Sequence, residues 1–177
     1  MTRRTLRTAL VTLALCTLAA CIVNLSFDMQ KVIAVQSQPG VASISQSQVV
    51  NLSDYQEIND HKSSIKSLDL DSADVVVASL NADNKATTVT GTLKLRKSLS
   101  DPPANDVLVG SLTNFSLAVN SKVNLPGSPA LDAFLLQQLQ TAGSFYVIVD
   151  GNIDQAPADL VLNVTLHASL GYDTGLF

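Results

Sequence analysis

The stretch LVLNVTLHASLGY, residues 160–172, indicates the fold class of this chain. Its apolar side chains recur at every second position, and polar side chains such as Asn163, Thr165 and His167 stand between them. A period of two places the two sets of side chains on opposite faces of a β-strand. The stretch therefore predicts a strand of an antiparallel sheet that buries one face and exposes the other to water.

Two earlier stretches predict a pair of strands on either side of the turn sequence NADNK. They are IKSLDLDSADVVVASL (residues 65–80) and TTVTGTLKLRK (residues 87–97), and the second alternates cleanly between apolar and polar positions. Because the turn between them is short, we expect the two strands to form a hairpin. The apolar positions of the first stretch do not keep one register, which predicts a bulge or bend near residues 72–74.

Three more stretches predict strands elsewhere in the chain. In IVNLSFDMQKVIAVQ (residues 22–36) the apolar pattern of Leu25, Phe27, Met29, then Val32 and Ala34 suggests a strand, and FYVIVDGNID (residues 145–154) precedes the last strand. VLVGSLTNFSLAVNSKV (residues 107–123) is interpreted as one long strand in which the register changes midway. The adjacent prolines in SLSDPPAND exclude helix and central strand there and indicate a loop.

Two helices are predicted. The clear one is amphipathic and covers about residues 129–142, with Ser128 as its N-cap, Pro129 in its first turn and Gly143 at its end. Its glutamines are assigned to the solvent-exposed face of the helix; they are Gln137, Gln138 and Gln140. A short helix over about residues 54–62 follows a Ser53–Gln56 pair with the spacing of a capping box.

These elements predict a mainly β protein. About seven or eight strands with two short helices, and no regular alternation of strand and helix, favour a single antiparallel β-sandwich or flattened barrel. Residues 21–177 are long enough to bury one core and are assigned to a single domain.

The charge pattern excludes several classes of partner. Once the three arginines among the first seven residues are set aside, 8 basic and 15 acidic residues leave a net charge of −7. An acidic surface argues against nucleic acid and against electrostatic docking to anionic lipid.

The first 21 residues have the layout of a secretory signal. MTRRTLR is basic, TALVTLALCTLAA is apolar but too short to span a bilayer, and small residues precede Cys21. The segment LAAC (residues 18–21) resembles the lipobox of bacterial lipoproteins. Cys16 does not fit this pattern because the bulky Leu15 directly precedes it.

The lipobox resemblance implies an anchored protein. Residues 1–20 would be cleaved, and Cys21 would carry diacylglycerol and acyl chains that attach the protein stably to a membrane. Ile22, and not Asp, follows the cysteine, which in the Gram-negative members of the family implies the outer membrane, with the domain facing the periplasm or the cell surface. The mature chain would then lack any free thiol or disulfide.

We find no pattern of residues that predicts catalysis or a cofactor. His61 and His167 lie in polar surroundings, and neither GxSxG nor a glycine-rich phosphate loop occurs. The best metal candidates are Asp69, Asp71 and Asp74 in DLDSAD, and Asp150, Asn152 and Asp154 in DGNID. Both stretches lack the glycine and glutamate that complete an EF-hand loop, so we predict that these groups simply face solvent, with a weak calcium site as the alternative. A sugar platform could come from Phe145, Tyr146 or Tyr172, although packing in the core is the favoured role of these aromatic residues.

Three functions are compatible with these observations. The favoured one is a non-enzymatic, lipid-anchored envelope protein that binds a partner or scaffolds an assembly. The first alternative is a lipid-binding or lipid-transfer protein with an apolar cavity between its sheets, gated by the helix around Phe134. The second is an envelope hydrolase, which would need a contact between His, Ser and Asp.

Overall fold

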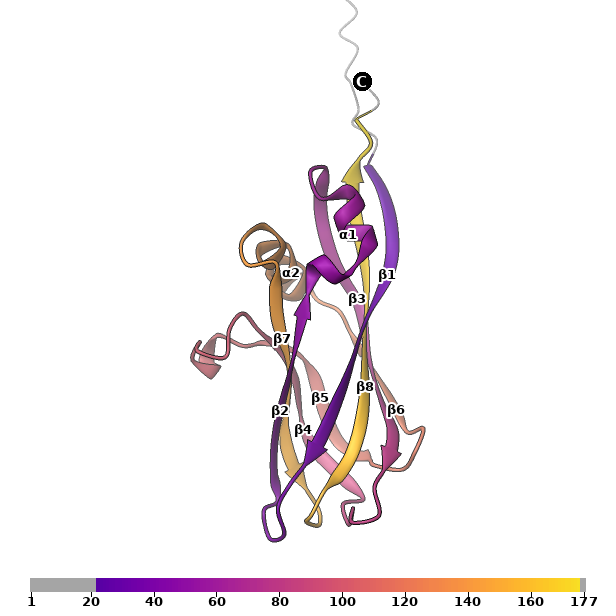
Figure 1. Cartoon of the computed structure of the whole chain (residues 1–177), viewed down its shortest axis with the longest axis vertical. Helices are drawn as coiled ribbons and strands as arrows, with labels where there is room; N and C mark the ends of the chain where they lie inside the picture. Colours follow the sequence, from indigo (N-terminus) through magenta and orange to yellow (C-terminus); the bar gives the residue numbers. More distant parts are fainter. Residues whose placement is uncertain (1–21, 176–177) are drawn as a thin grey trace, which may run out of the picture.

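The structure is a computed structural model that describes residues 22–175 (Figure 1). Within this range the chain forms eight strands, two α-helices and two short 3-10 helices. The strands are β1 (Ile22–Gln36), β2 (Ser43–Asn51), β3 (Ile65–Leu80), β4 (Thr88–Arg96), β5 (Val107–Ser116), β6 (Lys122–Pro126), β7 (Ser144–Ile153) and β8 (Asp159–Asp173). The helices are η1 (Leu52–Asp54), α1 (Gln56–His61), η2 (Pro103–Asn105) and α2 (Pro129–Gln140).

The strands form two antiparallel sheets of four, which confirms the predicted sandwich. One sheet has the order β1-β8-β3-β6 and the other has the order β2-β7-β4-β5. Strands from the two ends of the chain pair from the outside inward, β1 with β8, β2 with β7, β3 with β6 and β4 with β5. This double-sheet arrangement of eight strands is that of a jelly roll.

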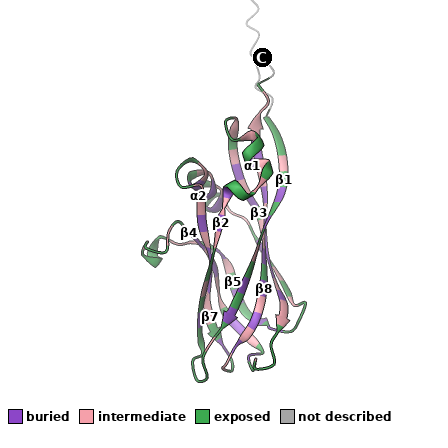
Figure 2. Ribbon diagram, viewed as in Figure 1, coloured by how far each residue is buried: buried purple, intermediate pink, exposed green. Residues whose placement is uncertain are grey.

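The space between the sheets is filled by apolar side chains. On β8 the buried positions are those predicted from the alternation, Leu160, Leu162, Val164, Leu166 and Ala168. Met29, Leu93 and Val147 have no solvent exposure and contribute to the same core. Figure 2 shows buried residues alternating with half-buried or exposed ones along the strands, and loops that are mostly exposed.

Three strands of the first sheet are longer than those of the second sheet, and the helices cover the part that extends beyond. β1, β3 and β8 have 15 or 16 residues, whereas the strands of the second sheet have 9 or 10. The part of the first sheet that extends beyond the second is covered by α1 and α2, which contribute the buried residues Ile58, Leu131 and Leu135 (Figure 1). In the part of the chain that is described, no helix has the length and apolar character needed to cross a bilayer.

The predicted helices exist, with changes at their ends. α2 begins after Ser128, with Pro129 in its first turn, and the chain leaves it at Gly143, whose φ is +67°. Gln138 was wrongly assigned to the wet side, because its side chain is only 1% exposed. The capping box was also wrong: α1 begins at Gln56, the preceding residue Tyr55 makes no side-chain cap, and Ser53 belongs to η1.

Two predicted strand patterns need correction. β1 keeps one register throughout, so Ile33 and Val35 are buried while Val32 is 62% exposed and Ala34 also faces outward. The single strand expected over residues 107–123 is two strands, because a turn near Asn120 (φ +67°) carries the chain from β5 in one sheet to β6 in the other.

The expected hairpin between residues 65–80 and 87–97 is wrong in its pairing. β3 and β4 exist, but they lie in different sheets, and β4 pairs with β5 and β7 instead. The connecting segment crosses the end of the sandwich, where the backbone N–H of Lys85 donates to the carbonyl of Pro157 at 2.9 Å. The predicted irregularity of β3 is present as a register shift between Leu70 and Ser72.

Candidate functional site

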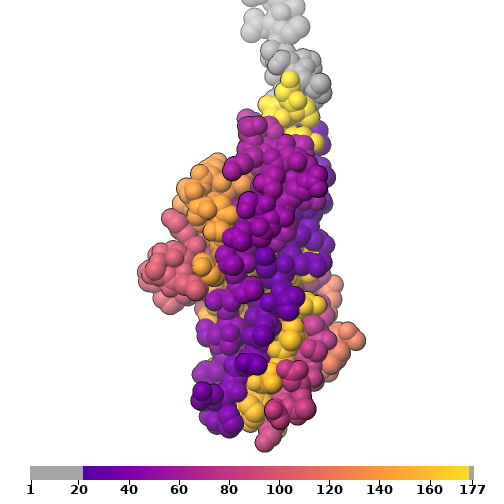
Figure 3. Space-filling view, viewed as in Figure 1, coloured from indigo at the N-terminus to yellow at the C-terminus, as the bar shows by residue number. Residues whose placement is uncertain are grey.

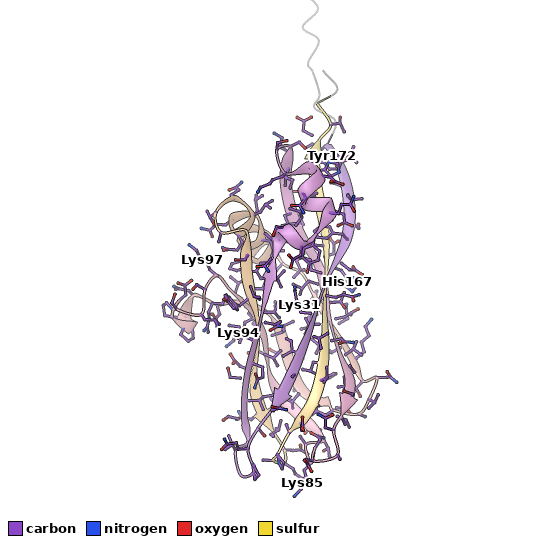
Figure 4. All side chains as sticks on the ribbon, viewed as in Figure 1. Lys31, Lys85, Lys94, Lys97, His167 and Tyr172 are labelled. Carbon is purple, nitrogen blue, oxygen red and sulfur yellow. The ribbon has the colours of Figure 1, made fainter. Side chains whose placement is uncertain are left out.

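The fold places both ends of the described chain at one end of the sandwich. Ile22 pairs with Asp173 in the register of β1 and β8, and the loops β1–β2, β3–β4, β5–β6 and β7–β8 lie at the opposite end. In Figure 4, Tyr172 marks the first end and Lys85 marks the second. At about 3.3 Å per residue, the 15 residues of β1 separate the two ends by about 50 Å.

A hollow of about 820 Å³ lies at the end that carries Lys85. We call it the distal hollow, and it is bounded by the segments 36–39, 82–85 and 156–159 together with Gln46 of β2. Its size is within the range of small-molecule sites.

Hydrogen bonds between the loops hold the distal hollow in shape. Ser37 and Ala158 are joined twice, because the N–H of Ser37 donates to the carbonyl of Ala158 and the N–H of Ala158 donates to the Ser37 hydroxyl, both at 2.9 Å. The side chain of Asn81 donates to Asp159 Oδ1 at 2.7 Å. The loops are thus tied to each other and not only to their own strands, which holds the hollow in one shape.

A second set of bonds fixes the β3–β4 loop beside the hollow. Asp154 accepts from the hydroxyl and the N–H of Thr87 and from the N–H of Thr88, at 2.5, 2.8 and 3.0 Å. These hydrogen bonds, the one from the Thr87 hydroxyl foremost, hold the pKa of Asp154 well below its usual range. Asp154 is therefore ionised and fixes this loop through three hydrogen bonds.

The lining of the distal hollow mixes polar and apolar side chains and carries little net charge. Three side-chain amides, those of Gln36, Gln38 and Gln46, can donate and accept hydrogen bonds, and Pro39 and Pro157 add apolar surface. No aromatic side chain belongs to the lining of this hollow. A surface of this mixed composition suits a peptide segment, which carries both polar and apolar groups, better than an acyl chain.

A second polar cluster crosses the outer face of the β1-β8-β3-β6 sheet at His167, which is labelled in Figure 4. Its Nδ1 lies 2.7 Å from Asp28 of β1, and its Nε2 lies 2.9 Å from Asp74 of β3. Asp74 also accepts from Lys122 at 2.8 Å and from Asn124 at 2.9 Å, both on β6. We call these five residues the outer-face cluster, and it links all four strands of the sheet.

The titration of the outer-face cluster follows from these contacts. Burial raises the pKa of Asp74, but the hydrogen bonds from its three partners outweigh this effect and hold the pKa well below the usual range. The hydrogen bonds to Asp74 and Asp28 raise the pKa of His167. Both ring nitrogens of His167 face carboxylates, so the ring has no nitrogen left to activate a serine hydroxyl or to bind a metal.

The three carboxylates considered as metal ligands in DLDSAD make different contacts in the structure. Asp74 belongs to the outer-face cluster, and Asp71 lies at the register shift of β3 and accepts from the Ser169 hydroxyl at 3.2 Å. Asp69 pairs across the strands with Ser169. Among residues 22–175, no group of three His, Cys, Asp or Glu side chains has the arrangement of a metal site.

The other residues considered for metal binding or catalysis contact neighbouring side chains or lie along a strand. Asp150 accepts from the Ser45 hydroxyl at 2.5 Å and pairs with Lys94 at 3.3 Å, and Asn152 lies further along β7. The rings of His61 and Tyr172 stack with their centroids 3.6 Å apart.

The aromatic candidates near α2 belong to the core. Phe145 is fully buried and meets the ring of Phe134 edge-on, with the centroids 5.9 Å apart. Tyr146 follows on β7 and is half-buried. Cys21 lies outside the described residues.

Sequence reasoning missed the distal hollow, because its lining comes from loops that are far apart in the chain. The turn sequence QPG (residues 38–40) and the APA segment (residues 156–158) marked those loops, but nothing in them showed that they would meet. Their meeting follows from the pairing of β1 with β8.

Comparisons with known proteins identify no family for this chain. No protein-family model matches the sequence, and no curated protein sequence is significantly similar to it. Similar solved structures include that of the decameric BFDV capsid protein, with 13% identity, a TM-score of 0.46, and coverage of 85% of this chain and 99% of that one.

Structures from two plant viruses are also similar in outline. The one from Desmodium yellow mottle tymovirus has 10% identity and a TM-score of 0.36, over 98% of this chain and 97% of that one. The one from turnip yellow mosaic virus has 11% identity and a TM-score of 0.36, over 97% and 91% of the two chains. With TM-scores below 0.5, these similarities imply no function for this chain.

Proposed function

We propose that this protein is a lipid-anchored, non-enzymatic protein of the bacterial cell envelope that binds a partner at its distal hollow. Residues 1–20 would serve as a cleaved signal, and Cys21 would carry the acyl chains. The observation that carries the proposal is the junction at this cysteine: the lipobox-like LAAC ends at Cys21, and β1 begins at the next residue, Ile22.

This junction gives the anchored molecule a defined orientation. A domain that begins directly after its lipid anchor has no linker on which to swing, so its first strand would rise from the membrane surface. The distal hollow would then be presented about 50 Å away from the anchor, at the other end of β1. Ile22 in place of Asp favours the outer membrane as the site of anchoring.

The binding role is favoured over the two alternatives by the chemistry of the interior and of His167. A lipid carrier needs an apolar cavity, whereas side chains such as Met29, Leu93 and Leu166 are fully buried between the sheets. A hydrolase needs a histidine that faces a hydroxyl nucleophile, whereas His167 faces Asp28 and Asp74.

Metabolic labelling tests the anchor. Cells that express the full chain should incorporate radiolabelled palmitate into it, and Cys21→Ser should abolish both the label and the retention in the membrane fraction. Cys16→Ser is the matched control and should change neither. Loss of the label from Cys16→Ser but not from Cys21→Ser would refute the assignment.

Site-specific photo-crosslinking in cells tests the binding site. A crosslinking amino acid in place of Gln38, an exposed residue of the distal hollow, should trap one defined protein partner. The same amino acid in place of Lys62, an exposed residue near the opposite end, is the control and should not trap that partner. Equal trapping from both positions, or from neither, would refute binding at the hollow.

A further inference from the structure

A second hollow lies on the side of the sandwich, between α2 and the loop that joins β4 to β5. Its volume is about 460 Å³, and we call it the side hollow. The loop contributes the charged side chains of Lys97 and Asp101 to its lining. The wall on α2 is a stripe at helical spacing that includes Ala130, Ala133, Phe134 and Gln138. Figure 3 shows the loop projecting from the side of the molecule next to α2.

Gln138 is the residue that indicates a ligand in the side hollow. Its side chain is 1% exposed, it belongs to the lining, and its Oε1 has no hydrogen-bond partner among residues 22–175. Buried polar groups in folded proteins nearly always have partners, because an unpaired one has lost its bonds to water without replacement. The other buried polar side chain of this range, Asp74, has three partners. A ligand with an N–H donor would supply the partner that Gln138 lacks.

The side hollow also carries one positive and one negative side chain that the described part of the chain leaves unpaired. Neither Lys97, which is labelled in Figure 4, nor Asp101 forms an ion pair with any residue of the range 22–175, and the two do not pair with each other. By contrast, Arg96 and Asp106 at the ends of the loop neutralise each other through bonds of 2.5 and 2.7 Å. These bonds fix the loop, and the charges of Lys97 and Asp101 are left for a ligand.

The apolar surface of the side hollow is small. Ala130 and Ala133 are exposed on α2, whereas Phe134 is only 8% exposed and its ring packs edge-on against Phe145. A ring buried to this extent offers no face on which a sugar could stack. The hollow therefore suits a compact ligand with a short apolar group better than it suits a sugar or a long acyl chain.

We propose that the side hollow binds a free α-amino acid with a short apolar side chain. The carboxylate of this ligand would pair with Lys97. Its ammonium group has three N–H donors and would serve both Asp101 and Oε1 of Gln138. Because an α-amino acid carries both charges, the donors and an apolar group around one carbon atom, it matches the three unpaired groups of the hollow together. The site is separate from the distal hollow, and the inference does not depend on the lipid anchor.

Isothermal titration calorimetry tests this inference on the full chain purified in detergent. Each standard amino acid is titrated in turn, and we expect binding of alanine, valine or leucine but not of aspartate or lysine. The N-acetylated form and the carboxamide form of the best ligand each lack one of its two charges. Each of these forms should bind at least tenfold more weakly, which corresponds to about 1.4 kcal/mol.

A pair of identical substitutions on α2 locates the ligand at the buried amide. Gln138→Leu should weaken binding at least tenfold. It should not lower the melting temperature, because it replaces an unpaired polar group by an apolar one of similar size. Gln140→Leu is the matched control, because Gln140 is exposed on the same helix outside the hollow, and it should leave binding unchanged.

A second pair of substitutions tests the contact with the carboxylate. Lys97→Gln should weaken binding of the amino acid at least tenfold, and it should remove the difference between the amino acid and its carboxamide. Lys85→Gln removes a lysine at the distal hollow instead and should change neither (Figure 4).

Three results would overturn the inference. The first is that no amino acid binds. The second is that the N-acetylated form binds as tightly as the free amino acid, which would assign the hollow to the C-terminus of a peptide. The third is that Gln138→Leu binds the amino acid as tightly as the unmodified chain does.

Discussion

Replacement of His167 by alanine would remove the side chain that joins β1 to β3 across β8. In the folded protein its ring contacts Asp28 at 2.7 Å and Asp74 at 2.9 Å. Asp74 would keep its bonds to Lys122 and Asn124, whereas Asp28, at 50% exposure, would be left to water. The variant should therefore be folded but less stable.

The size of the loss follows from the exposure of the groups. A hydrogen bond to a charged group contributes about 1.5–3 kcal/mol when it is buried. The His167 side chain is 34% exposed and that of Asp28 is 50% exposed, so solvent screening reduces the contact between them to less than about 1 kcal/mol. We expect His167→Ala to lower the free energy of unfolding by about 1–2 kcal/mol near pH 6.

The loss should depend on pH in a defined direction. The pKa of His167 is raised in the folded state, so its stabilising effect is complete below the unfolded value of about 6.5 and disappears as the pH rises through the folded value. The neutral ring has one N–H donor for two carboxylates. The pKa of Asp74 is lowered, so its effect is present above about 4 and is lost as the pH falls through the folded value. The outer-face cluster should stabilise the protein most between about pH 4 and 6.5.

Urea unfolding followed by circular dichroism at pH 6.0 and 8.5 measures both effects. The difference between the unmodified chain and His167→Ala should be larger at pH 6.0. Asn163→Ala is the control, because Asn163 is an exposed, uncharged residue on the same face of β8, and its effect should be equal at the two pH values. An equal loss for His167→Ala at both pH values would refute the role of its charge.

Three other predictions concern packing and the loop over residues 97–106. Phe145→Ala should lower the free energy of unfolding by about 3–5 kcal/mol in urea titrations, because the ring is fully buried; a loss below about 1 kcal/mol would contradict its place in the core. Gly91→Ala should cost about 1–3 kcal/mol in the same assay, because an added Cβ would overlap the backbone oxygen of Asp150; an unchanged midpoint would contradict this close approach. Arg96→Ala should speed chymotrypsin cleavage within the loop, because Arg96 holds Asp106 at the loop's end through bonds of 2.5 and 2.7 Å; unchanged cleavage would show that the ion pair does not restrain the loop.

The sequence predicted local structure well because side-chain alternation directly reports which face of a strand is buried. The pattern of residues 160–172 and the helix after Ser128 are both confirmed. In β1 the prediction failed at Val32 and Ala34, since small apolar residues occur on both faces of that strand and the pattern alone cannot choose between them. Gln138 failed for the opposite reason, because tertiary packing buries a residue type that is usually exposed.

Which strands pair is harder to predict from the sequence than where the strands are. A short connection between two strands suggests a hairpin, yet among residues 22–175 only β4 and β5 are consecutive strands that pair. The other connections cross from one sheet to the other, and the crossing is decided by long-range packing of both inner faces. The same limitation concealed the distal hollow and the outer-face cluster, whose members are brought together by the pairing of β8 with β1 and β3.

The pairing of the first strand with the last also explains how the proposed membrane anchor and the proposed binding surface could lie at opposite ends of the fold. Because β1 and β8 are antiparallel and of equal length, Ile22 and Asp173 must share one end, and the loops after β1 and before β8 must share the other. Those loops are joined to each other by hydrogen bonds and contribute few side chains to the core, so their sequences can change without loss of the sandwich. A protein anchored directly before β1 would therefore hold its distal hollow away from the membrane without any linker, and exchanges within these loops should change what the hollow binds while leaving the pairing of β1 with β8 intact.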